Sequence, residues 1–362
     1  MTPSDGVFLA ATIELAEQGR LTCAPNPPVG CIIVRNQQIL GRGYHVRTGE
    51  GHAEVNAIAD AGGDILGATV YVSLEPCAFV GRTPACAQTL IDAQVARVVI
   101  AATDPHPQVA GAGIRMLRAA GIEVNLLTQA AALDLIQGYV SRELSGKPLV
   151  RLKTASSLDG ATALASGESQ WITGEAARQD VQYWRARSDA IITGVQTVIE
   201  DNPQLNVRAP QYQHARAPLR VVLDSRLSTP PQATVLTDGG ATLLVHNASV
   251  DVPEHLHNAR SVSLLALPAG PQDLSAVLQH LASLGCNEVL VEAGAKVCGS
   301  FVAAQLWDEW ICYVAPKWLG VASQPLANFT VAQLDQAPTG KVMDIRQIGD
   351  DVCVRLKADR GE

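Results

Sequence analysis

The sequence has little of several features that mark particular classes of protein. Aromatic residues make up only 4% of its 362 residues, and the net charge at pH 7 is −8. This composition does not favour a nucleic-acid-binding protein, which would present a basic groove with aromatic stacking platforms. The longest apolar runs, such as RVVIAAT at 97–103, have the length of a strand. They fall far short of the roughly 20 residues that cross a bilayer, so we expect no membrane partner.

The N-terminal segment also lacks the basic start of a secretory signal peptide. Its pattern predicts an amphipathic helix with Ser4 or Asp5 as the N-cap, and we therefore expect a cytoplasmic protein. Eight cysteines are scattered through the chain. Without secretory features, reduced thiols are the better interpretation than disulfides.

The length and the pattern of the chain indicate two α/β domains. The first 145 or so residues alternate strand and helix, with a hairpin turning at Asn36 and Gln37, which predicts a sheet covered by helices on both faces. A Ser-Gly-Lys-Pro break places the boundary near Gly146, giving domains 1–146 and 147–362. The second half alternates again, with loops expected at 203–218 and 228–240.

Two segments of the first half contain the residues of a hydrolytic zinc site. GEGHAEVNAIADAGG places His52 and Glu54 at the start of a predicted helix, and LEPCAFVGRTPAC contains Cys77 and Cys86. The imidazole and the two thiolates supply three ligands and leave a fourth position for water. Glu54 stays free for proton transfer, as in zinc nucleobase deaminases. Here eight residues separate the cysteines, where the deaminase signature has two.

Three other interpretations of these residues remain open. A deaminase that edits nucleic acid shares the zinc chemistry, but it leaves more than 200 C-terminal residues without a role. A non-catalytic protein stabilised by zinc would need a fourth protein ligand, for which His45 and His106 are the nearby candidates. Buried or bridged cysteines without any metal are the plainest alternative.

The second half lacks the usual dinucleotide fingerprint, G-x-G-x-x-G after a strand. It does contain VLVEAGAKVCGSFVAAQL at 289–306, which predicts a strand, a loop with glycine and a helix. Backbone N–H groups at such a helix start are suited to binding phosphate. An ordinary strand-to-helix turn is the competing interpretation.

Further motifs resemble one family closely. GRTP between the two cysteines, after HAE, is followed in the second half by KTASSLDG, SGESQWIT, GVQTVIEDNPQLNVR, VVLDS and VEAG. In this order and spacing they resemble the bacterial bifunctional riboflavin-biosynthesis deaminase/reductase family, over nearly the whole chain. The resemblance implies an N-terminal cytidine-deaminase-like α/β/α domain and a C-terminal dihydrofolate-reductase-like α/β domain. It also implies Zn²⁺ and NADPH as cofactors and a small phosphorylated pyrimidine as substrate.

The implied chemistry has two steps. The first domain would deaminate 2,5-diamino-6-ribosylamino-4(3H)-pyrimidinone 5′-phosphate, with Glu54 transferring protons. The second would reduce the ribosyl group to a ribityl chain. We also expect a homo-oligomer, a dimer or a tetramer, although no sequence feature specifies the oligomeric state.

The resemblance assigns substrate contacts in the first domain to Asn26, His45, Arg82 and Asp104, with Arg82 the candidate for the phosphate. A structural histidine at His45 and a turn role for Asn26 beside two prolines are competing interpretations.

In the second domain the resemblance places five residues on the substrate: Ser169, Arg185, Leu205, Arg208 and Glu292. Arginines at two of these positions are suited to gripping phosphate. Lys153 and Asp201 are candidates for steering protons, against the alternatives of an ordinary ion pair or a cap. The residues expected along NADPH are Ser156, Trp171, Thr197, Asp201, Gly294, Ala295, Lys296, Val297, Cys298, Gly299 and Ser300.

Two loops depart from the family pattern. Ala293 stands where the family has the first glycine of Glu-Gly-Gly, and a required positive φ there would cost about 1 kcal/mol or more. In the metal loop, Ala78, Phe79 and Val80 replace small-polar, histidine and aromatic residues, and Ala85 replaces a common second proline. We therefore expect any family contact made through that histidine to differ in this chain.

Overall fold

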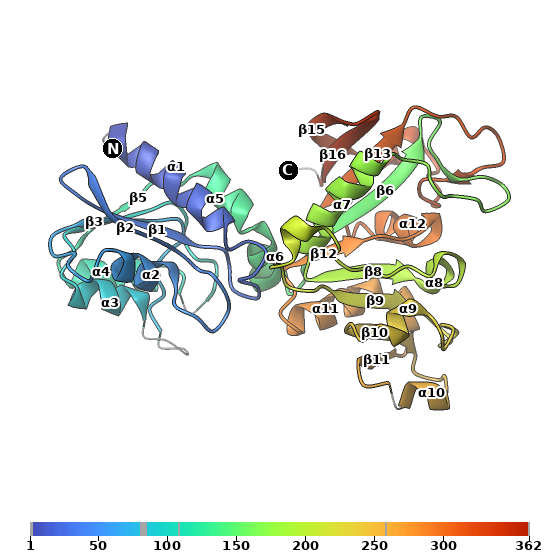
Figure 1. Ribbon diagram of the computed structural model, residues 1–362, viewed down its shortest axis with the longest axis horizontal. Coiled ribbons are helices and arrows are strands. Elements are labelled where there is room, and N and C mark those ends of the chain that lie inside the picture. Colours follow the sequence, from blue (N-terminus) through green and yellow to red (C-terminus); the bar gives the residue numbers. More distant parts are fainter. Residues whose placement is uncertain (1–2, 80–84, 108, 258, 361–362) are drawn as a thin grey trace. The chain divides into compact units, whose positions relative to one another are not determined.

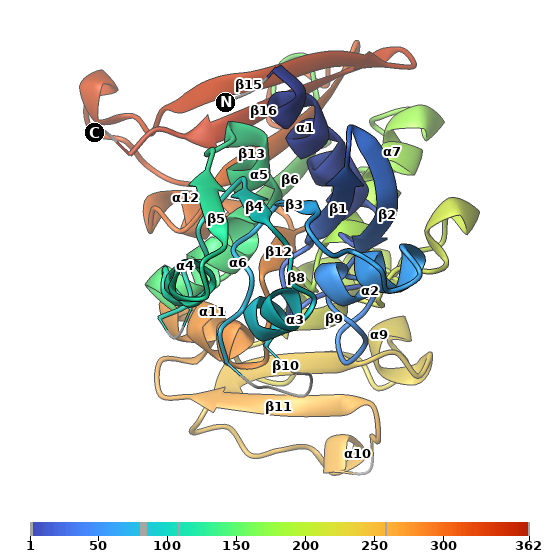
Figure 2. The same cartoon turned by 90° about the vertical axis from the view of Figure 1, so that its left-hand side faces the viewer.

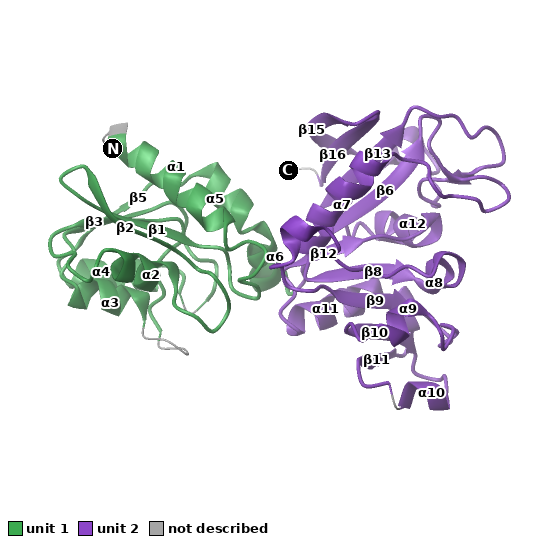
Figure 3. Ribbon diagram, in the orientation of Figure 1, with its two compact units in different colours: residues 1–146 green, residues 147–362 purple. Residues whose placement is uncertain are grey.

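The computed structural model describes residues 3–79, 85–107, 109–257 and 259–360. The chain divides into two compact units, residues 1–146 and 147–362 (Figure 3). Each unit has its own sheet and its own hydrophobic cores. The α/β class expected for both halves is therefore confirmed.

Unit 1 is built on a five-stranded sheet of order β2-β1-β3-β4-β5. β1 runs antiparallel to β2 and β3, and β3, β4 and β5 are parallel. The strands are β1 (Gly30–Arg35), β2 (Gln38–Tyr44), β3 (Thr69–Val72), β4 (Arg97–Ile100) and β5 (Glu123–Leu126). The helices are α1 (Pro3–Glu17), α2 (Ala53–Asp60), α3 (Cys86–Asp92), α4 (Ala112–Ala119), α5 (Ala130–Leu135) and α6 (Gln137–Ser145).

Helices cover both faces of this sheet, which makes unit 1 a three-layer structure (Figure 1). One core packs α2, α3 and α4 against alternate residues of the strands, such as Ile33 and Val70. The other core packs α1 and α5 against the opposite residues, such as Ile32 and Tyr71. Since successive strand residues point to opposite faces, this alternation is what a sheet buried on both sides requires.

The predicted hairpin turn is confirmed. Asn36 and Gln37 connect β1 to β2 with φ angles of 52° and 65°, the left-handed pair that two-residue hairpins favour.

The predicted cap of the first helix is wrong. The helix already begins at Pro3, and Asp5 lies inside its first turn, buried and bonded to Tyr71 and Arg97. The carboxylate is therefore used for tertiary contacts and does not act as a cap.

Unit 2 contains a nine-stranded sheet of order β11-β10-β9-β8-β12-β6-β13-β16-β15. Neighbours from β11 to β13 are parallel, and β16 and β15 continue the sheet in antiparallel pairing. The strands are β6 (Leu149–Ser157), β8 (Ala190–Gly194), β9 (Leu219–Leu223), β10 (Thr242–Asn247), β11 (Val262–Leu267), β12 (Glu288–Val291), β13 (Glu309–Ala315), β15 (Gly340–Ile348) and β16 (Asp351–Ala358). A separate small sheet pairs β7 (Ala161–Ala163) with β14 (Gln324–Pro325).

The helices of unit 2 lie on both faces of its large sheet. They are α7 (Glu175–Arg187), α8 (Val195–Asp201), α9 (Thr234–Thr237), α10 (Glu254–His257), α11 (Leu274–Ser283) and α12 (Ala295–Ala303). α11 and α12 pack with one face, and α7, α8, α9 and α10 contribute to the core on the other. Three 3-10 turns lie at η1 (Pro210–Tyr212), η2 (Gly270–Gln272) and η3 (Leu334–Gln336).

The strands and helices expected from the sequence are present, but the C-terminal hairpin was not anticipated. β15 and β16 form a long two-stranded ribbon at the edge of the sheet (Figure 2). The stretches expected as loops, 203–218 and 228–240, contain only the short elements η1 and α9. In the part of the chain that the structure describes, no helix combines the length and apolar character needed to cross a bilayer.

Candidate functional sites

Three side chains of unit 1 converge at one edge of its sheet. His52 is the N-cap of α2, Cys77 follows β3, and Cys86 is the first residue of α3. Their candidate ligand atoms all lie within 4.8 Å of one another. His52 Nδ1 is 3.2 Å from Cys86 Sγ and 3.8 Å from Cys77 Sγ. A tetrahedral zinc ion with bonds of about 2.0–2.3 Å holds such atoms about 3.6–3.8 Å apart, so the donor set fits zinc.

Among the described residues, this group has three members and no fourth protein ligand. The two histidines considered as a fourth ligand do not belong to this group. His45 uses both ring nitrogens elsewhere, since Nε2 pairs with Asn26 Nδ2 at 3.0 Å and Nδ1 with the Gly51 carbonyl at 3.1 Å. His106 is not in the group, and its Nε2 lies 3.9 Å from Glu143. The arrangement is that of an open site rather than a closed structural one.

The environment of Cys77 favours its thiolate form. A hydrogen bond from the Cys86 thiol, followed by one from His52, lowers the pKa of Cys77 to about 4. The Cys86 backbone N–H also donates to Cys77 Sγ at 3.3 Å. Pairing with Cys77 raises the pKa of Cys86 in turn. One thiolate is thus ready to bind a cation before any metal arrives.

Glu54 lies beside these ligands without belonging to the group. It sits in the first turn of α2 and is only 3% exposed. Burial, and then the negative charge of Cys77, raise the pKa of Glu54. A buried carboxylate with a raised pKa, next to a candidate metal position, is suited to accepting and returning a proton.

The expected substrate residues of unit 1 fall into three situations. Asn26 and His45 form one hydrogen-bonded pair, and the His45 ring lies edge-on to His52 with centroids 5.2 Å apart. Asp104 is buried and accepts hydrogen bonds from the His106 N–H and the Tyr139 hydroxyl at 2.8 and 3.1 Å. Arg82 lies outside the described residues.

The metal loop contains two features that the sequence analysis did not assign. Phe79, one of the departures from the family pattern, is 41% exposed and its ring lies 5.8 Å from that of His106. Glu75 is buried and accepts backbone N–H groups from Asp104, Gly111 and Ile114. The Glu-Pro-Cys triplet was the only available signal for Glu75.

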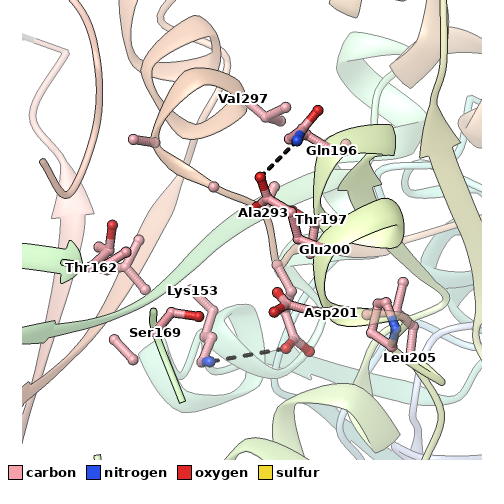
Figure 4. Close-up of a pocket in the computed structure, with 18 of the residues that line it drawn as sticks. Lys153, Thr162, Ser169, Gln196, Thr197, Glu200, Asp201, Leu205, Ala293 and Val297 are labelled. Atoms are coloured by element: carbon pink, nitrogen blue, oxygen red, sulfur yellow. Dashed lines mark hydrogen bonds and ion pairs between the residues drawn. The ribbon is translucent and has the colours of Figure 1, made fainter. Parts of the chain in front are cut away.

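Unit 2 contains a cavity of about 1330 Å³. It opens at the carboxyl ends of parallel strands, where α/β sheets bind their ligands; Lys153 lies in β6, Gly194 ends β8, and Glu292 follows β12. Most residues expected to contact substrate or NADPH line it (Figure 4). They are Lys153, Ser169, Trp171, Arg185, Thr197, Asp201, Leu205, Arg208, Glu292, Gly294, Ala295, Lys296, Val297 and Ser300.

One carboxylate organises the cations of the cavity wall. Glu292 accepts two hydrogen bonds from Arg185, at 2.6 and 2.9 Å, and lies 4.0 Å from Lys153 Nζ. Burial is the largest single influence and would raise the pKa of Glu292, but Arg185, Lys153 and Arg208 together outweigh it and the pKa is lowered. Burial also lowers the pKa of Lys153. The ion pair expected as the alternative for Lys153 is therefore present, and it faces the cavity.

Arg208 is held differently from Arg185. Arg185 also donates to the Asn206 carbonyl at 3.2 Å, so all three of its guanidinium nitrogens are engaged. Arg208 is exposed, and its guanidinium donates to side-chain oxygens of Gln204 and Asn206, at 3.4 and 3.0 Å. Of the two arginines, Arg208 is the one whose charge faces solvent.

Asp201, Gln170, Trp171 and Arg178 also line the cavity. Gln170 donates to the Asp201 carboxylate at 3.3 Å, and burial raises the pKa of Asp201. Trp171 is 64% exposed, and Arg178 lies over its ring at 4.6 Å from the centroid. An exposed indole beside a cation offers a flat surface for a ring of a ligand.

The loop between β12 and α12 contains Ala293, which replaces a glycine of the family pattern. Ala293 does not adopt a positive φ, and Gly294 has a φ of −68° as the N-cap of α12. The strain considered for Ala293 is therefore absent.

Three residues expected along NADPH do not line the cavity. Ser156 and Cys298 are buried, and Gly299 packs so closely on Asn328 that a Cβ would lie 2.0 Å from its carbonyl oxygen.

A further loop lines the cavity without having been assigned a role. Asp224 directly follows β9 and accepts hydrogen bonds from Ser228 and Thr229. These bonds hold the turn that brings Ser225, Arg226 and Ser228 to the cavity. The Asp-Ser pair at the end of a predicted strand was the signal for it.

Taken together, the two sites define a two-domain α/β enzyme that joins a deaminase-type zinc centre to a reductase-type cavity. The family described as the cytidine and deoxycytidylate deaminase zinc-binding region matches residues 3–102. The family described as the RibD C-terminal domain matches residues 148–354. The chain belongs to the RibD family of riboflavin-biosynthesis proteins.

Similarity to members of this family extends over the full length. The riboflavin biosynthesis protein RibD of Escherichia coli is 43% identical, over 97% of this chain and 99% of its own. The solved structure of Acinetobacter baumannii RibD, form 2, is 42% identical with a TM-score of 0.92, covering 98% and 99%. A diaminohydroxyphosphoribosylaminopyrimidine deaminase/5-amino-6-(5-phosphoribosylamino)uracil reductase from Thermotoga maritima is 30% identical with a TM-score of 0.88, again covering 98% and 99%.

Proposed function

We propose that the chain catalyses two consecutive steps of riboflavin biosynthesis, one in each unit. Residues 1–146 deaminate 2,5-diamino-6-ribosylamino-4(3H)-pyrimidinone 5′-phosphate by hydrolysis. Residues 147–362 reduce the ribosyl side chain with NADPH and give 5-amino-6-ribitylamino-uracil 5′-phosphate. The cofactors are Zn²⁺ and NADPH. When bound, zinc makes water nucleophilic near neutral pH and NADPH supplies a hydride.

The observation that carries the deaminase proposal is the three-ligand centre with a buried carboxylate beside it. His52, Cys77 and Cys86 would hold the ion, and Glu54 lies outside the ligand group. Glu54 takes a proton from the attacking water and delivers it to the pyrimidine ring nitrogen. It then carries the hydroxyl proton of the resulting tetrahedral adduct to the amino group, which leaves as ammonia while the carbonyl forms. A general acid and base at this position typically contributes about 10²–10⁴-fold to the rate.

The remaining polar groups of unit 1 orient the substrate in this proposal. His45 is paired with Asn26, and its ring lies beside that of the proposed zinc ligand His52, which supports a role for both near the substrate. Asp104 is fixed by Tyr139 and by its own loop. Arg82 is the candidate for the ribose phosphate.

In unit 2 the cavity wall divides between substrate and cofactor. Arg208 serves the substrate phosphate, because Arg185 is already committed to Glu292 and Asn206. Glu292, held by Arg185, accepts hydrogen bonds from hydroxyl groups of the ribosyl chain. Ser169 and Leu205 also contact the substrate. Lys153 and Asp201 steer protons at the sugar end. Trp171, Thr197, Asp201 and the loop residues 294–297 and 300 lie along NADPH.

A coupled assay tests this proposal. Purified chain incubated with the diaminopyrimidinone nucleotide releases ammonia with or without NADPH, and absorbance at 340 nm falls only after deamination. Glu54→Gln lowers ammonia release by about 10²–10⁴-fold, retains its zinc, and still reduces substrate that has already been deaminated. Bound zinc without turnover of any aminopyrimidine nucleotide would instead identify a scaffold.

The composition of the chain also bears on its class of substrate. The net charge of −8 and the aromatic content of 4% support a small-molecule substrate rather than a nucleic acid. We further propose that the chain works in the cytoplasm as a homo-oligomer, a dimer or a tetramer.

A further inference from the structure

One polar side chain in the wall of the unit 2 cavity is buried and has no role so far. Gln182 lies in the middle of α7 and is only 6% exposed. It lines the cavity together with Arg185, which follows it by about one turn of the helix. Because residues three apart on a helix are neighbours on one face, the two side chains share the side of α7 that faces the cavity.

The amide oxygen of Gln182 is already in use. It accepts the backbone N–H of Arg208 at 2.7 Å, and Arg185 donates to the carbonyl oxygen of Asn206 at 3.2 Å. Two neighbouring side chains of α7 therefore hold the loop that contains Arg208. Since the oxygen is the only acceptor of a side-chain amide, the contact with Arg208 also fixes which way the amide points.

The other half of this amide, its N–H₂ group, is available to a ligand. Among the residues that the structure describes, none accepts a hydrogen bond from Gln182 Nε2. This nitrogen is not one of the unpaired polar atoms that the described chain encloses completely, so it remains accessible from the cavity that Gln182 lines. Buried polar groups are nearly always hydrogen-bonded. An available donor on a buried side chain of a cavity wall therefore indicates a contact that a bound molecule completes.

The charges near this donor favour an anion as its partner. One carboxylate, that of Glu292, interacts with three cations of the same wall, which are Arg185, Lys153 and Arg208. Partial burial, followed by the charge of Arg185, lowers the pKa of Arg208, and an anionic group beside Arg208 would raise that pKa again. An amide N–H₂ group can donate to a hydroxyl or to an anionic oxygen. The surplus of cations in this wall decides for the anion.

We propose that Gln182 is a substrate-binding residue of unit 2, whose N–H₂ group donates to a phosphate oxygen of the substrate beside Arg208. Arg208 supplies the positive charge, and Gln182 supplies an uncharged, directed donor. Because the oxygen of the same amide holds the backbone of Arg208, one side chain sets the position of both groups that meet the phosphate. The inference deepens the proposed function and rests on it for the identity of the phosphorylated substrate.

A substitution of the same shape separates the two halves of the amide. Gln182→Glu keeps an oxygen that accepts the Arg208 N–H and replaces the N–H₂ group with a second oxygen, so the melting temperature should stay close to that of the wild type. In the reductase assay with substrate that has already been deaminated, the KM for this substrate should rise roughly 10–100-fold, because a donor becomes a repelling anion. The KM for NADPH should not change.

Gln279→Glu is the matched control. It makes the same change of charge at an exposed position of α11 that does not line the cavity, and it should leave both KM values unchanged. A wild-type KM for the substrate in Gln182→Glu would overturn the proposal. A rise in the KM for NADPH in place of the KM for the substrate would also overturn it, because Gln182 would then contact the cofactor.

Calorimetry with ribose 5-phosphate and with ribose measures the contact without turnover. The wild type should bind ribose 5-phosphate, and Gln182→Glu should bind it roughly tenfold more weakly or worse, whereas ribose should bind both proteins equally. If Gln182→Glu is unstable, Gln182→Met replaces it, since it removes the donor without adding charge and should also weaken only the binding of ribose 5-phosphate.

The outcomes of the two experiments separate this inference from the proposed function. Equal binding of ribose 5-phosphate by wild type and variant, no binding by the wild type, or an equal loss for ribose would contradict a contact with the phosphate. A wild type that oxidises no NADPH with any aminopyrimidine nucleotide would refute the proposed function, and the calorimetry would then decide the role of Gln182 by itself.

Discussion

At the scale of single residues, Glu75 joins the metal loop to the rest of unit 1. It stands two positions before Cys77 and is 3% exposed. Its carboxylate accepts the N–H groups of Asp104, Gly111 and Ile114, at 3.4, 3.0 and 3.1 Å. One side chain thereby fixes the end of β3 against the loop that follows β4. Both a proposed metal ligand and a proposed substrate residue depend on that junction.

Replacing Glu75 by Gln should weaken zinc binding. The amide retains one accepting oxygen and turns an N–H₂ group towards backbone N–H donors, which leaves buried groups unpaired at about 1–3 kcal/mol each. We expect a lower melting temperature and a zinc dissociation constant raised at least tenfold, measured by chelator competition. Glu14→Gln, at an exposed position of α1, should change neither value. Unchanged zinc affinity in Glu75→Gln would show that the junction does not position Cys77.

The two arginines of the cavity should respond differently to the same substitution. Arg208→Gln removes an exposed charge, so we expect an unchanged melting temperature. We also expect a higher KM for the phosphorylated substrate of the reductase reaction. Arg185→Gln breaks a buried pair with Glu292, which typically costs about 3–5 kcal/mol. That variant should melt at a lower temperature and also lose kcat. Equal effects of the two variants on KM and stability would contradict the division proposed for them.

At the scale of elements, regular periodicity made most strands and helices predictable. The buried run at 97–100 and the turn at Asn36 and Gln37 depend on local chemistry alone, and both were identified correctly. The hairpin of β15 and β16 was missed because β15 is exposed along most of its length and shows no clean alternation of burial. The site was predicted through residue types and resemblance, whereas Glu75 and Asp224 act through loop geometry that no sequence pattern specifies.

A buried network of ion pairs ties the elements of unit 2 together. Arg151 of β6 is fully buried and donates to Glu309 of β13 at 2.7 Å and to Glu288 of β12 at 2.6 Å. Arg187 of α7 also donates to Glu288 at 2.7 Å. Burial is the largest single influence and would raise the pKa of Glu309, but the combined attraction of Arg151, Arg187 and Arg355 outweighs it and the pKa is lowered. The network therefore stabilises the fold only while its carboxylates are ionised.

This network predicts an acid-dependent stability. Because the folded pKa of Glu309 is below its unfolded value of about 4.3, its contribution is complete above that pH and is lost as the pH falls through the folded pKa. Glu309→Gln should therefore melt well below the wild type at pH 7, and the gap should narrow as the pH falls below about 4. Asp359→Asn, which breaks the exposed pair with Lys341, should cost no more than about 1 kcal/mol. If the difference in melting temperature between the wild type and Glu309→Gln stayed constant down to pH 3, the stabilising role of the ionised Glu309 would be contradicted.

At the scale of the whole molecule, the two chemistries draw on separate sets of residues. The candidate metal ligands lie between positions 52 and 86, within unit 1. The residues that line the large cavity run from 153 to 328, all within unit 2. Each unit also packs its own cores. The described residues of each site therefore all belong to one unit, and we expect a change confined to one site to leave the chemistry of the other intact.

Removal of the metal should therefore separate the two activities. After treatment with a chelator, ammonia release from the diaminopyrimidinone nucleotide should fall to background, since three ligands without their ion leave no activated water. Reduction of substrate that has already been deaminated, followed at 340 nm, should keep its rate, because the wall of Lys153, Arg185 and Glu292 holds together through its own ion pairs. Added zinc should restore ammonia release, and added magnesium should not, because Mg²⁺ prefers oxygen ligands over thiolates. If chelation abolished both activities and zinc restored both, the metal would serve the whole chain, and the assignment of one reaction to each unit would be wrong.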